Sequence, residues 1–394
     1  MTIGELNPHL RLLLGPGPSP VHPRVLKAMS SHVVGHLDPD FLAVMDDCQQ
    51  MLRELVHTRN RVTFPVSGTG SAAMEASVCN MIEEGDKAII CINGVFGERM
   101  ADVAGRYGAK VIRVEAPWGK PIDPQDVKKA LGANPGAALV GIVHAETSTG
   151  VLQPMEEIGG LCRGHGALLL MDCVTSLGGV PVEVDKWGIE IAYSGTQKCL
   201  SCPPGLAPIT FSERALGKAR ERKGKVKSWY FDVTMVEKYW GQDRVYHHTG
   251  PITMNYALRE ALRIIFEEGL ERRFARHALA SRALQAGVEA LGLSMFAREG
   301  FRTPTLNAVA LKPGMEDGPI RRRLLDGFDI EIGGGLGAVA GKIWRIGMMG
   351  HGASQANVVY LLSALEVIFR QMGYTGSVGQ GVAAATRVYA EAVS

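Results

Sequence analysis

The sequence has almost no excess of charge of either sign and no long apolar run. Its 42 Lys and Arg residues balance 40 Asp and Glu residues, a formal net charge of +2, so a broad attraction to nucleic acid or to an anionic membrane is not expected. No window approaches the roughly 18 apolar residues of a membrane span. The first residues, MTIGELNPHLRLLLGPGPSP, lack the basic start and long apolar block of a secretory signal. We therefore expect a cytoplasmic protein.

The cysteines of the sequence form no disulfide or metal-binding pattern. The seven residues, an odd number, stand mostly in apolar surroundings, which is typical of reduced thiols in a cytosolic protein. Cys199 and Cys202 form a C-x-x-C, but a zinc site would need a second ligand pair at suitable spacing, and the sequence has none. We predict no metal site; for Cys199 and Cys202 a redox pair stays the alternative to two unrelated thiols.

Short apolar runs alternate with helical patterns from about residue 60 to residue 212. Several runs lack polar alternation, as expected of strands that are covered on both faces. The runs are KAIICING at 87–94, KVIRVEAP at 110–117, ALVGIVHAE at 138–146, ALLLMDCV at 167–174, IEIAYSG at 189–195 and LAPITFS at 206–212. Asp123 as N-cap and Pro124 as first helical residue mark one helix start. The alternation predicts an α/β domain with a largely parallel sheet.

The remaining residues show a different pattern. Residues 251–293 indicate two helices parted by Gly269, and mixed strand and helix patterns follow, up to a last helix from about Ser354 to Met372. A small α+β C-terminal domain is therefore predicted. We divide the chain into an N-terminal arm at 1–20, a large domain at 21–265 and a small domain at 266–394.

Two glycine-rich segments are candidates for binding a phosphate. SGTGSAAMEA, at 67–76, follows an apolar run and precedes a helical pattern, and a turn that opens a helix offers free N–H groups and a positive dipole end. It lacks the G-K-[ST] of a P-loop and the third glycine of a dinucleotide fingerprint. GGGLGAVAG, at 333–341, stands late in the chain and precedes a predicted strand. Taken alone, each is more often a tight turn.

Asp172 and Lys198 are the chemically distinctive pair. Asp172 follows four apolar residues near the carboxyl end of a predicted buried strand, and Lys198 stands 26 residues later at the same end of the next strand. Ligands bind at that edge of a parallel sheet. Pyridoxal phosphate needs a lysine for its Schiff base and a carboxylate beside the pyridine nitrogen. With the turn at 67–76 for the phosphate, the pair predicts this cofactor, although each residue alone fits a surface or turn position.

The motifs resemble those of class V aminotransferases of fold type I, in the branch of alanine–glyoxylate, serine–pyruvate and 3-hydroxykynurenine transaminases. The shared motifs, in the family's order and spacing, are LLLGPGPSP, SGTGSAAMEA, NGVFGERM, HAETSTGVLQP, MDCVTSLGG, YSGTQKCLSCPPG, YHHT and GKIWRIGMMG. The resemblance implies a large domain with a mostly parallel seven-stranded sheet, a small α+β C-terminal domain and pyridoxal 5'-phosphate as cofactor. It also implies a homodimer with its sites at the subunit interface.

The resemblance assigns residues to the cofactor ring. Lys198 would form the Schiff base and Asp172 would pair with the ring nitrogen. Phe96 would stack on the ring; the family usually has Trp there, so stacking survives with less area. Thr147 would hydrogen-bond the phenolic oxygen, where Ser is commoner.

The resemblance assigns further residues to the phosphate and the substrate. Family members often have His at the position of Ser71, which puts one phosphate contact in doubt. Gly70, Ser71 and Gln197 would hold the phosphate, and Tyr246 and Thr249 would reach it from the second subunit. The substrate residues would be Arg345, which clamps the α-carboxylate, Gly17 of the N-terminal loop, and Gly35 and His36 of the partner chain.

The function that follows is transamination from a small amino acid, alanine or serine, to glyoxylate or pyruvate by a ping-pong mechanism. The alternatives are (S)-ureidoglycine–glyoxylate and, at greater distance, pyridoxamine–pyruvate transamination. VEAPWGKPI, YFDVTMVEKYWG and GQGVAAATRVY resemble the ureidoglycine group, whose members tend to carry Gln at His36 and Asn at Tyr246. A cysteine desulfurase would need a cysteine near the C-terminal domain, and all seven precede residue 203. A nucleotide-binding dehydrogenase would place its glycine motif earlier in the sheet.

Overall fold

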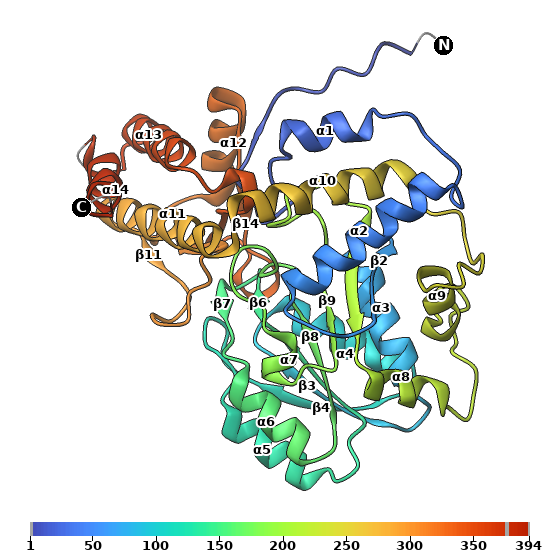
Figure 1. The fold of residues 1–394 in the computed structure, drawn as a ribbon. Coiled ribbons are helices and arrows are strands. Elements are labelled where there is room, and N and C mark those ends of the chain that lie inside the picture. Colours follow the sequence, from blue (N-terminus) through green and yellow to red (C-terminus); the bar gives the residue numbers. More distant parts are fainter. Residues whose placement is uncertain (1–2, 375–377, 393–394) are drawn as a thin grey trace.

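A seven-stranded sheet lies at the centre of the larger part of the molecule, in a computed structural model that describes residues 3–374 and 378–392 (Figure 1). The strands are β2 (Val62–Ser67), β3 (Lys87–Ile92), β4 (Lys110–Glu115), β5 (Leu139–Val143), β8 (Leu168–Asp172), β9 (Ile191–Tyr193) and β10 (Leu206–Phe211). Their order across the sheet is β2-β10-β9-β8-β5-β3-β4, with β10 antiparallel to both neighbours and the other pairs parallel. The predicted α/β class and mostly parallel seven-stranded sheet are confirmed.

Helices cover both faces of this sheet, so the strands are buried on both sides. Because successive strand residues point to opposite faces, Ile89 and Leu169 belong to one core and Ile90 and Leu170 to another. The first core contains residues of α1 (Pro23–Met29), α2 (Pro39–Leu55), α5 (Pro124–Ala133), α6 (Glu156–Gly164), α7 (Val184–Trp187) and α10 (Ile252–Glu268). The second contains residues of α3 (Gly70–Met81), α4 (Val95–Arg106), α8 (Glu213–Arg220) and α9 (Val233–Trp240).

Local sequence signals set several helix ends. The Asp123 carboxylate accepts a hydrogen bond from the N–H of Gln125 at 2.9 Å, and Pro124 opens α5, as predicted. Gly269, with φ of 84°, ends α10 and precedes α11 (Leu270–Ala290). A residue with a Cβ is strained at that angle, so the predicted break at Gly269 is confirmed with its cause.

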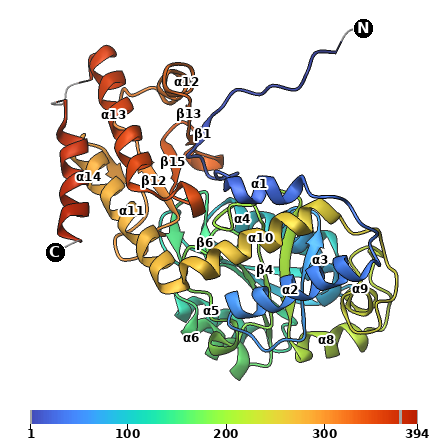
Figure 2. The ribbon, with the colours of Figure 1, turned by 45° about the horizontal axis from the view of Figure 1, so that its top comes forward.

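The C-terminal residues build a smaller antiparallel sheet with helices packed on it. Its strands, in order, are β11 (Ser294–Met295), β12 (Leu306–Ala310), β15 (Ile343–Gly347) and β14 (Gly333–Gly334). Figure 2 shows α11, α13 (Gln355–Gln371) and α14 (Gln380–Glu391) side by side, with α12 (Asp317–Phe328) beyond them. The boundaries that we place after residues 20 and 265 stay a prediction, and residues 1–2, 375–377 and 393–394 within those ranges lie outside the described residues.

Helix α14 was not predicted, because the sequence indicated that the helix ending near Met372 was the last. Its buried residues include Ala384, Ala385 and Tyr389, which join the core around α11. The Glu366 carboxylate of α13 accepts hydrogen bonds from backbone N–H groups at the start of α14, such as that of Gly381 at 2.8 Å. Small alanines give a weak periodic signal, so this helix depends on tertiary contacts that the sequence pattern does not display.

The N-terminal arm connects the two parts of the molecule. Strand β1 (Leu12–Leu13) pairs in parallel with β13 (Ile330–Glu331), and the N–H of Gly347 donates to the carbonyl of Leu14 at 2.8 Å. A few residues later, the N–H of Ser19 donates to the carbonyl of Gln197 at 2.8 Å. The arm therefore lies between β15 and the loop that follows β9. No helix of the described residues is long and apolar enough to cross a membrane.

Candidate active site

A cavity at the carboxyl edge of the central sheet brings together seven of the nine residues that we assigned to the cofactor. It lies where β2, β5, β8 and β9 end and where α3 and α4 begin, the edge at which parallel α/β sheets bind ligands. These seven residues are Gly70, Ser71, Phe96, Thr147, Asp172, Gln197 and Lys198. Tyr246 and Thr249 do not line it and are exposed in this chain.

Asp172 is the last residue of β8 and is held by two hydrogen bonds. Its Oδ1 accepts from the N–H of Val174 at 2.9 Å, and its Oδ2 accepts from the Tyr193 hydroxyl at 2.7 Å. Burial raises the pKa of Asp172 to about 6, while these two donors oppose the rise. The side chain is thus a fixed carboxylate that stays mostly ionised at neutral pH.

Tyr193 is a site residue that the sequence analysis missed. It ends β9 directly opposite Asp172 in the parallel register, which places its ring beside the carboxylate. A usable signal was present, because the run IEIAYSG ends in a tyrosine at the same sheet edge as the predicted aspartate. Within the run, however, Tyr193 also fits the role of one more apolar core residue.

Lys198 is buried in the loop after β9, where its surroundings lower the pKa of its amine. Burial, followed by the positive charge of Arg345, lowers the pKa of Lys198 to about 8. Its Nζ donates to the carbonyl of Pro16. A Cβ on Gly17 would lie 2.7 Å from the Cδ and Nζ of this lysine, and Gly17 has φ of 108°, so only glycine fits there. The neutral amine, the nucleophilic form, is therefore accessible near neutral pH.

Arg345 stands in the middle of β15 with its guanidinium largely free of protein partners. Its side chain is buried, and its Nε donates to the carbonyl of Gly334 at 2.7 Å. It forms no ion pair with an acidic side chain in the described part of the chain, and burial lowers the pKa of Arg345. A buried guanidinium with unused donors is suited to a bidentate carboxylate ligand.

Phe96 is placed by a buried carboxylate that the sequence analysis did not single out. The Oε2 of Glu146 accepts from the N–H of Phe96 at 3.1 Å, at the start of α4, where the helix dipole favours a negative charge. On the next turn, the guanidinium of Arg99 lies 4.9 Å from the centre of the Phe96 ring and donates to the Ser71 hydroxyl at 3.3 Å. Arg99, three residues after Phe96 on the same helix face, thus adds a cation to the cavity.

Two further polar groups in the cavity bear on whether a cofactor fits. The hydroxyls of Thr147 and Thr175 are hydrogen-bonded at 2.8 Å. The Oε1 of Gln197 is buried and has no hydrogen-bond partner in the part of the chain that the structure describes, a state that buried polar groups usually avoid. With Gly70 as the first residue of α3, the cavity combines a helix N-terminus, an unsatisfied amide, a cation and a fixed carboxylate, which fit pyridoxal phosphate.

The four residues assigned to the second subunit lie on the surface. Tyr246 is 57% exposed, and its ring centre lies 5.2 Å from that of His36. Gly35 and Thr249 are also exposed. The structure therefore separates the predicted residues into a buried set around Lys198 and an exposed set beside Tyr246.

Comparison with known proteins agrees with this geometry. The profile of the family "Aminotransferase class-V" matches residues 11–316. The chain belongs to this family. It is an aminotransferase, and the predicted membership is confirmed, as is the fold type I architecture.

Three similar proteins cover almost the whole chain. The (S)-ureidoglycine–glyoxylate transaminase of Bacillus subtilis is 41% identical over 98% of this chain and 97% of its own. The crystal structure of alanine–glyoxylate aminotransferase from Nostoc sp. is 49% identical, with a TM-score of 0.92 over 94% of this chain and 98% of that one. The crystal structure of ureidoglycine–glyoxylate aminotransferase from Bacillus subtilis is 42% identical, with a TM-score of 0.96 over 98% and 100%.

Proposed function

We propose that this aminotransferase uses pyridoxal 5'-phosphate to move an amino group from a small amino acid, alanine or serine, to glyoxylate, with pyruvate as a further acceptor. One observation carries the proposal: buried Lys198 shares a cavity with Asp172, and its pKa is lowered by the charge of Arg345, a guanidinium that forms no ion pair among the described residues. The relatives support glyoxylate, because it appears in the names of both groups of similar proteins.

The cavity residues would hold the cofactor at three places. Asp172 would receive the ring nitrogen and Phe96 would lie against the ring. Thr147 would donate to the phenolic oxygen. The N-terminus of α3 at Gly70, together with Ser71 and Gln197, would bind the phosphate. Arg99 lines the same cavity. When bound, the cofactor supplies an aldehyde for the amine and an electron sink for the substrate carbanion.

Lys198 and Arg345 would divide the work on the substrate. The neutral Nζ of Lys198 would hold the cofactor through its aldehyde and, once an amino acid has displaced it, would take the proton from the substrate Cα and deliver it to the cofactor carbon. Arg345 would bind the α-carboxylate through its two-pronged donor set, which orients the Cα–H bond toward Nζ. Gly17, packed on the lysine, would limit the space on the substrate side and favour short side chains.

The site would be completed by a second copy of the chain. Tyr246 and Thr249 would reach the phosphate, and Gly35 and His36 would line the substrate side, from the neighbouring subunit. The Tyr246–His36 pair at the surface supports this. The Tyr246 side chain is 57% exposed, and covering so large an aromatic ring with a partner lowers the free energy of the assembly.

(S)-Ureidoglycine–glyoxylate transamination is the second candidate. It is favoured by the 98% coverage of this chain in the match to the Bacillus subtilis transaminase. His36 and Tyr246 favour alanine or serine instead, because the ureidoglycine group tends to carry Gln and Asn at these positions. The two candidates differ only in the amino donor.

A titration of the purified holoenzyme with single amino donors tests the proposal. Alanine or serine should discharge the absorbance of the bound cofactor, and glyoxylate should restore it. In the matched variant His36→Gln, the order of donors should change, since this side chain would face the variable group. If ureidoglycine is used far faster than alanine or serine, the second candidate is correct. If no donor changes the spectrum, the proposed function is wrong.

A further inference from the structure

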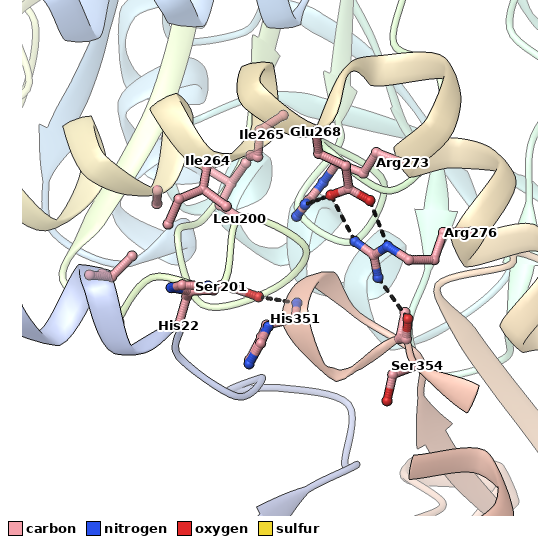
Figure 3. A pocket seen from close by; sticks show the side chains of 13 residues that line it. His22, Leu200, Ser201, Ile264, Ile265, Glu268, Arg273, Arg276, His351 and Ser354 are labelled. Carbon is pink, nitrogen blue, oxygen red and sulfur yellow. Dashed lines mark hydrogen bonds and ion pairs between the residues drawn. The ribbon is translucent and has the colours of Figure 1, made fainter. Parts of the chain in front are cut away.

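A second cavity, lined in part by Leu200 and Ser201, lies beside the loop that carries Lys198, and its wall holds a partly buried ionic cluster (Figure 3). Glu268, the last residue of α10, bonds two arginines of α11. Its Oε1 accepts from Arg276 Nε at 2.6 Å, and its Oε2 accepts from Arg276 Nη2 at 2.9 Å and from Arg273 Nη1 at 2.7 Å. One carboxylate therefore fixes both guanidinium groups.

The two arginines use their other N–H groups on backbone carbonyls of separate segments. Arg273 donates to the loop after β8 and to the residue that follows Lys198. Arg276 donates twice to the segment that follows β15, the strand that carries Arg345. The acceptors are the carbonyls of Gly178, Cys199, Gly350 and Ala353. The cluster thus binds the lysine loop and the arginine strand to the same carboxylate.

The lysine loop and the segment after β15 also touch directly. The hydroxyl of Ser201 accepts from the N–H of His351 at 2.7 Å, and Ser201 has φ of 51°, a left-handed conformation that costs a serine free energy. A Cβ on Gly350 would lie 1.9 Å from that hydroxyl oxygen. The Gly350 N–H donates to His277 Nε2 at 2.9 Å. Because the two segments are this close, neither can move without the other or without breaking these hydrogen bonds.

The charges of the cluster compensate one another. The Arg273 side chain is 3% exposed, and a guanidinium buried to this extent needs a counter-ion. Burial lowers the pKa of Arg273, and the Glu268 carboxylate opposes that shift. Burial alone would raise the pKa of Glu268, but the two arginines outweigh it and the pKa is lowered. All three side chains find their hydrogen-bond partners within the chain.

We propose that Glu268, Arg273 and Arg276 are positioning residues of the transamination site. They set the distance between the Nζ of Lys198 and the guanidinium of Arg345, and hence where the substrate Cα lies when its carboxylate is bound. The inference rests on the proposed function, in which Arg345 binds the carboxylate and Lys198 moves the Cα proton. None of the three touches the substrate; they act through the backbone on either side of it.

Amide hydrogen exchange of the cofactor-free protein tests the coupling without any catalysis. Glu268→Gln should accelerate exchange about tenfold or more in both residues 199–202 and residues 350–353, because the arginine bonded to each segment loses the carboxylate that fixes it. Arg276→Gln should do so mainly at residues 350–353 and spares the buried Arg273–Glu268 pair, which guards against a variant that fails to fold. The matched control is Glu267→Gln on the same helix, whose partners Arg24 and Arg263 lie on the surface.

Kinetics of the holoenzyme then tell positioning from mere support of the fold. In Glu268→Gln, KM for the donor and for glyoxylate should rise about tenfold and kcat should fall, because a small displacement of the reacting groups is costly. The cofactor Kd should change less than about threefold, since Gly70, Phe96 and Asp172 stand on α3, α4 and β8, which receive no hydrogen bond from the cluster. Glu267→Gln should match the wild type in every measurement.

Three outcomes overturn the proposal. The first is unchanged exchange in both Glu268→Gln and Arg276→Gln, and the second is faster exchange with unchanged KM and kcat. The third is an equal effect of Glu267→Gln, which would mean a general loss of stability. A wild-type protein that transaminates no small amino acid contradicts the proposed function instead, and the exchange data would still decide whether the cluster couples the two segments.

Discussion

The buried and the exposed residues of the site are held in different ways. Around Asp172, the carboxylate has a donor on each oxygen and is enclosed by β8 and β9 of one chain. Around Tyr246, two rings lie against each other at an interplanar angle of 50°, and more than half of the tyrosine faces solvent. The first set is preorganised by the fold of a single chain, which is what electrostatic stabilisation requires. Under the proposed function, the second set would become part of a site only when a second copy of the chain covers it.

The largest expected effect falls on the buried set. Lys198→Ala should lower transamination by about 10³-fold or more, because the chain loses both its nucleophile and its proton carrier. In the wild type, borohydride should fix the cofactor covalently to Lys198, as read by peptide mapping. A label on another lysine, or no label, would contradict the assignment of the buried set.

Asp172→Asn should be the next most severe change. Because Asn has nearly the same shape as Asp, the variant should fold and bind the cofactor like the wild type. Turnover should fall by about 10²–10³-fold because a charged partner of the ring nitrogen is lost. Turnover is measured with the donor that the titration identifies, and cofactor binding by fluorescence. Near wild-type turnover in a fully loaded variant would remove Asp172 from this role.

The exposed set can be tested by mixing two inactive chains. Lys198→Ala chains and Tyr246→Ala/Thr249→Ala chains should each be inactive as homodimers. Hybrid dimers contain one intact site, so an equal mixture that exchanges subunits freely should recover about a quarter of wild-type activity. Hybrids confirmed by mass that stay inactive would show that the whole site is built within one chain, and the distinction between the two sets would fail.

The smallest effect is a shift in pH dependence. Cofactor attachment to the cofactor-free protein needs the neutral amine of Lys198, so its rate should rise through a midpoint near the pKa of about 8. The positive charge of Arg345 lowers this pKa, so Arg345→Gln should move the midpoint to higher pH. Arg321→Gln, which removes a cation that is paired with Asp317 on α12, should leave it in place. A flat rate from pH 7 to 9, or a downward shift, would contradict the assignment.

The sequence predicted the parts of the fold that short-range signals determine. The start of α5 at Pro124 and the break at Gly269 follow from residue types whose backbone preferences are strong. The same holds for the edge that bears Asp172 and Lys198, because runs of apolar residues separated by helical patterns imply a parallel sheet. The position of Glu146, which supports the site, depends on which elements become neighbours, and no local pattern indicates that. Tyr193 differs, because its place at the end of an apolar run was a usable signal.

The path of the N-terminal arm has a consequence for biosynthesis. Leu12 pairs with Ile330, and Gly17 packs on Lys198, so the arm is held in part by a strand that is synthesised long after it. Closing so long a loop is slow compared with forming local contacts. A nascent chain can complete its central sheet while the catalytic lysine is still uncovered. The arm should therefore reach its final position beside Lys198 only after β13 and β15 have been translated.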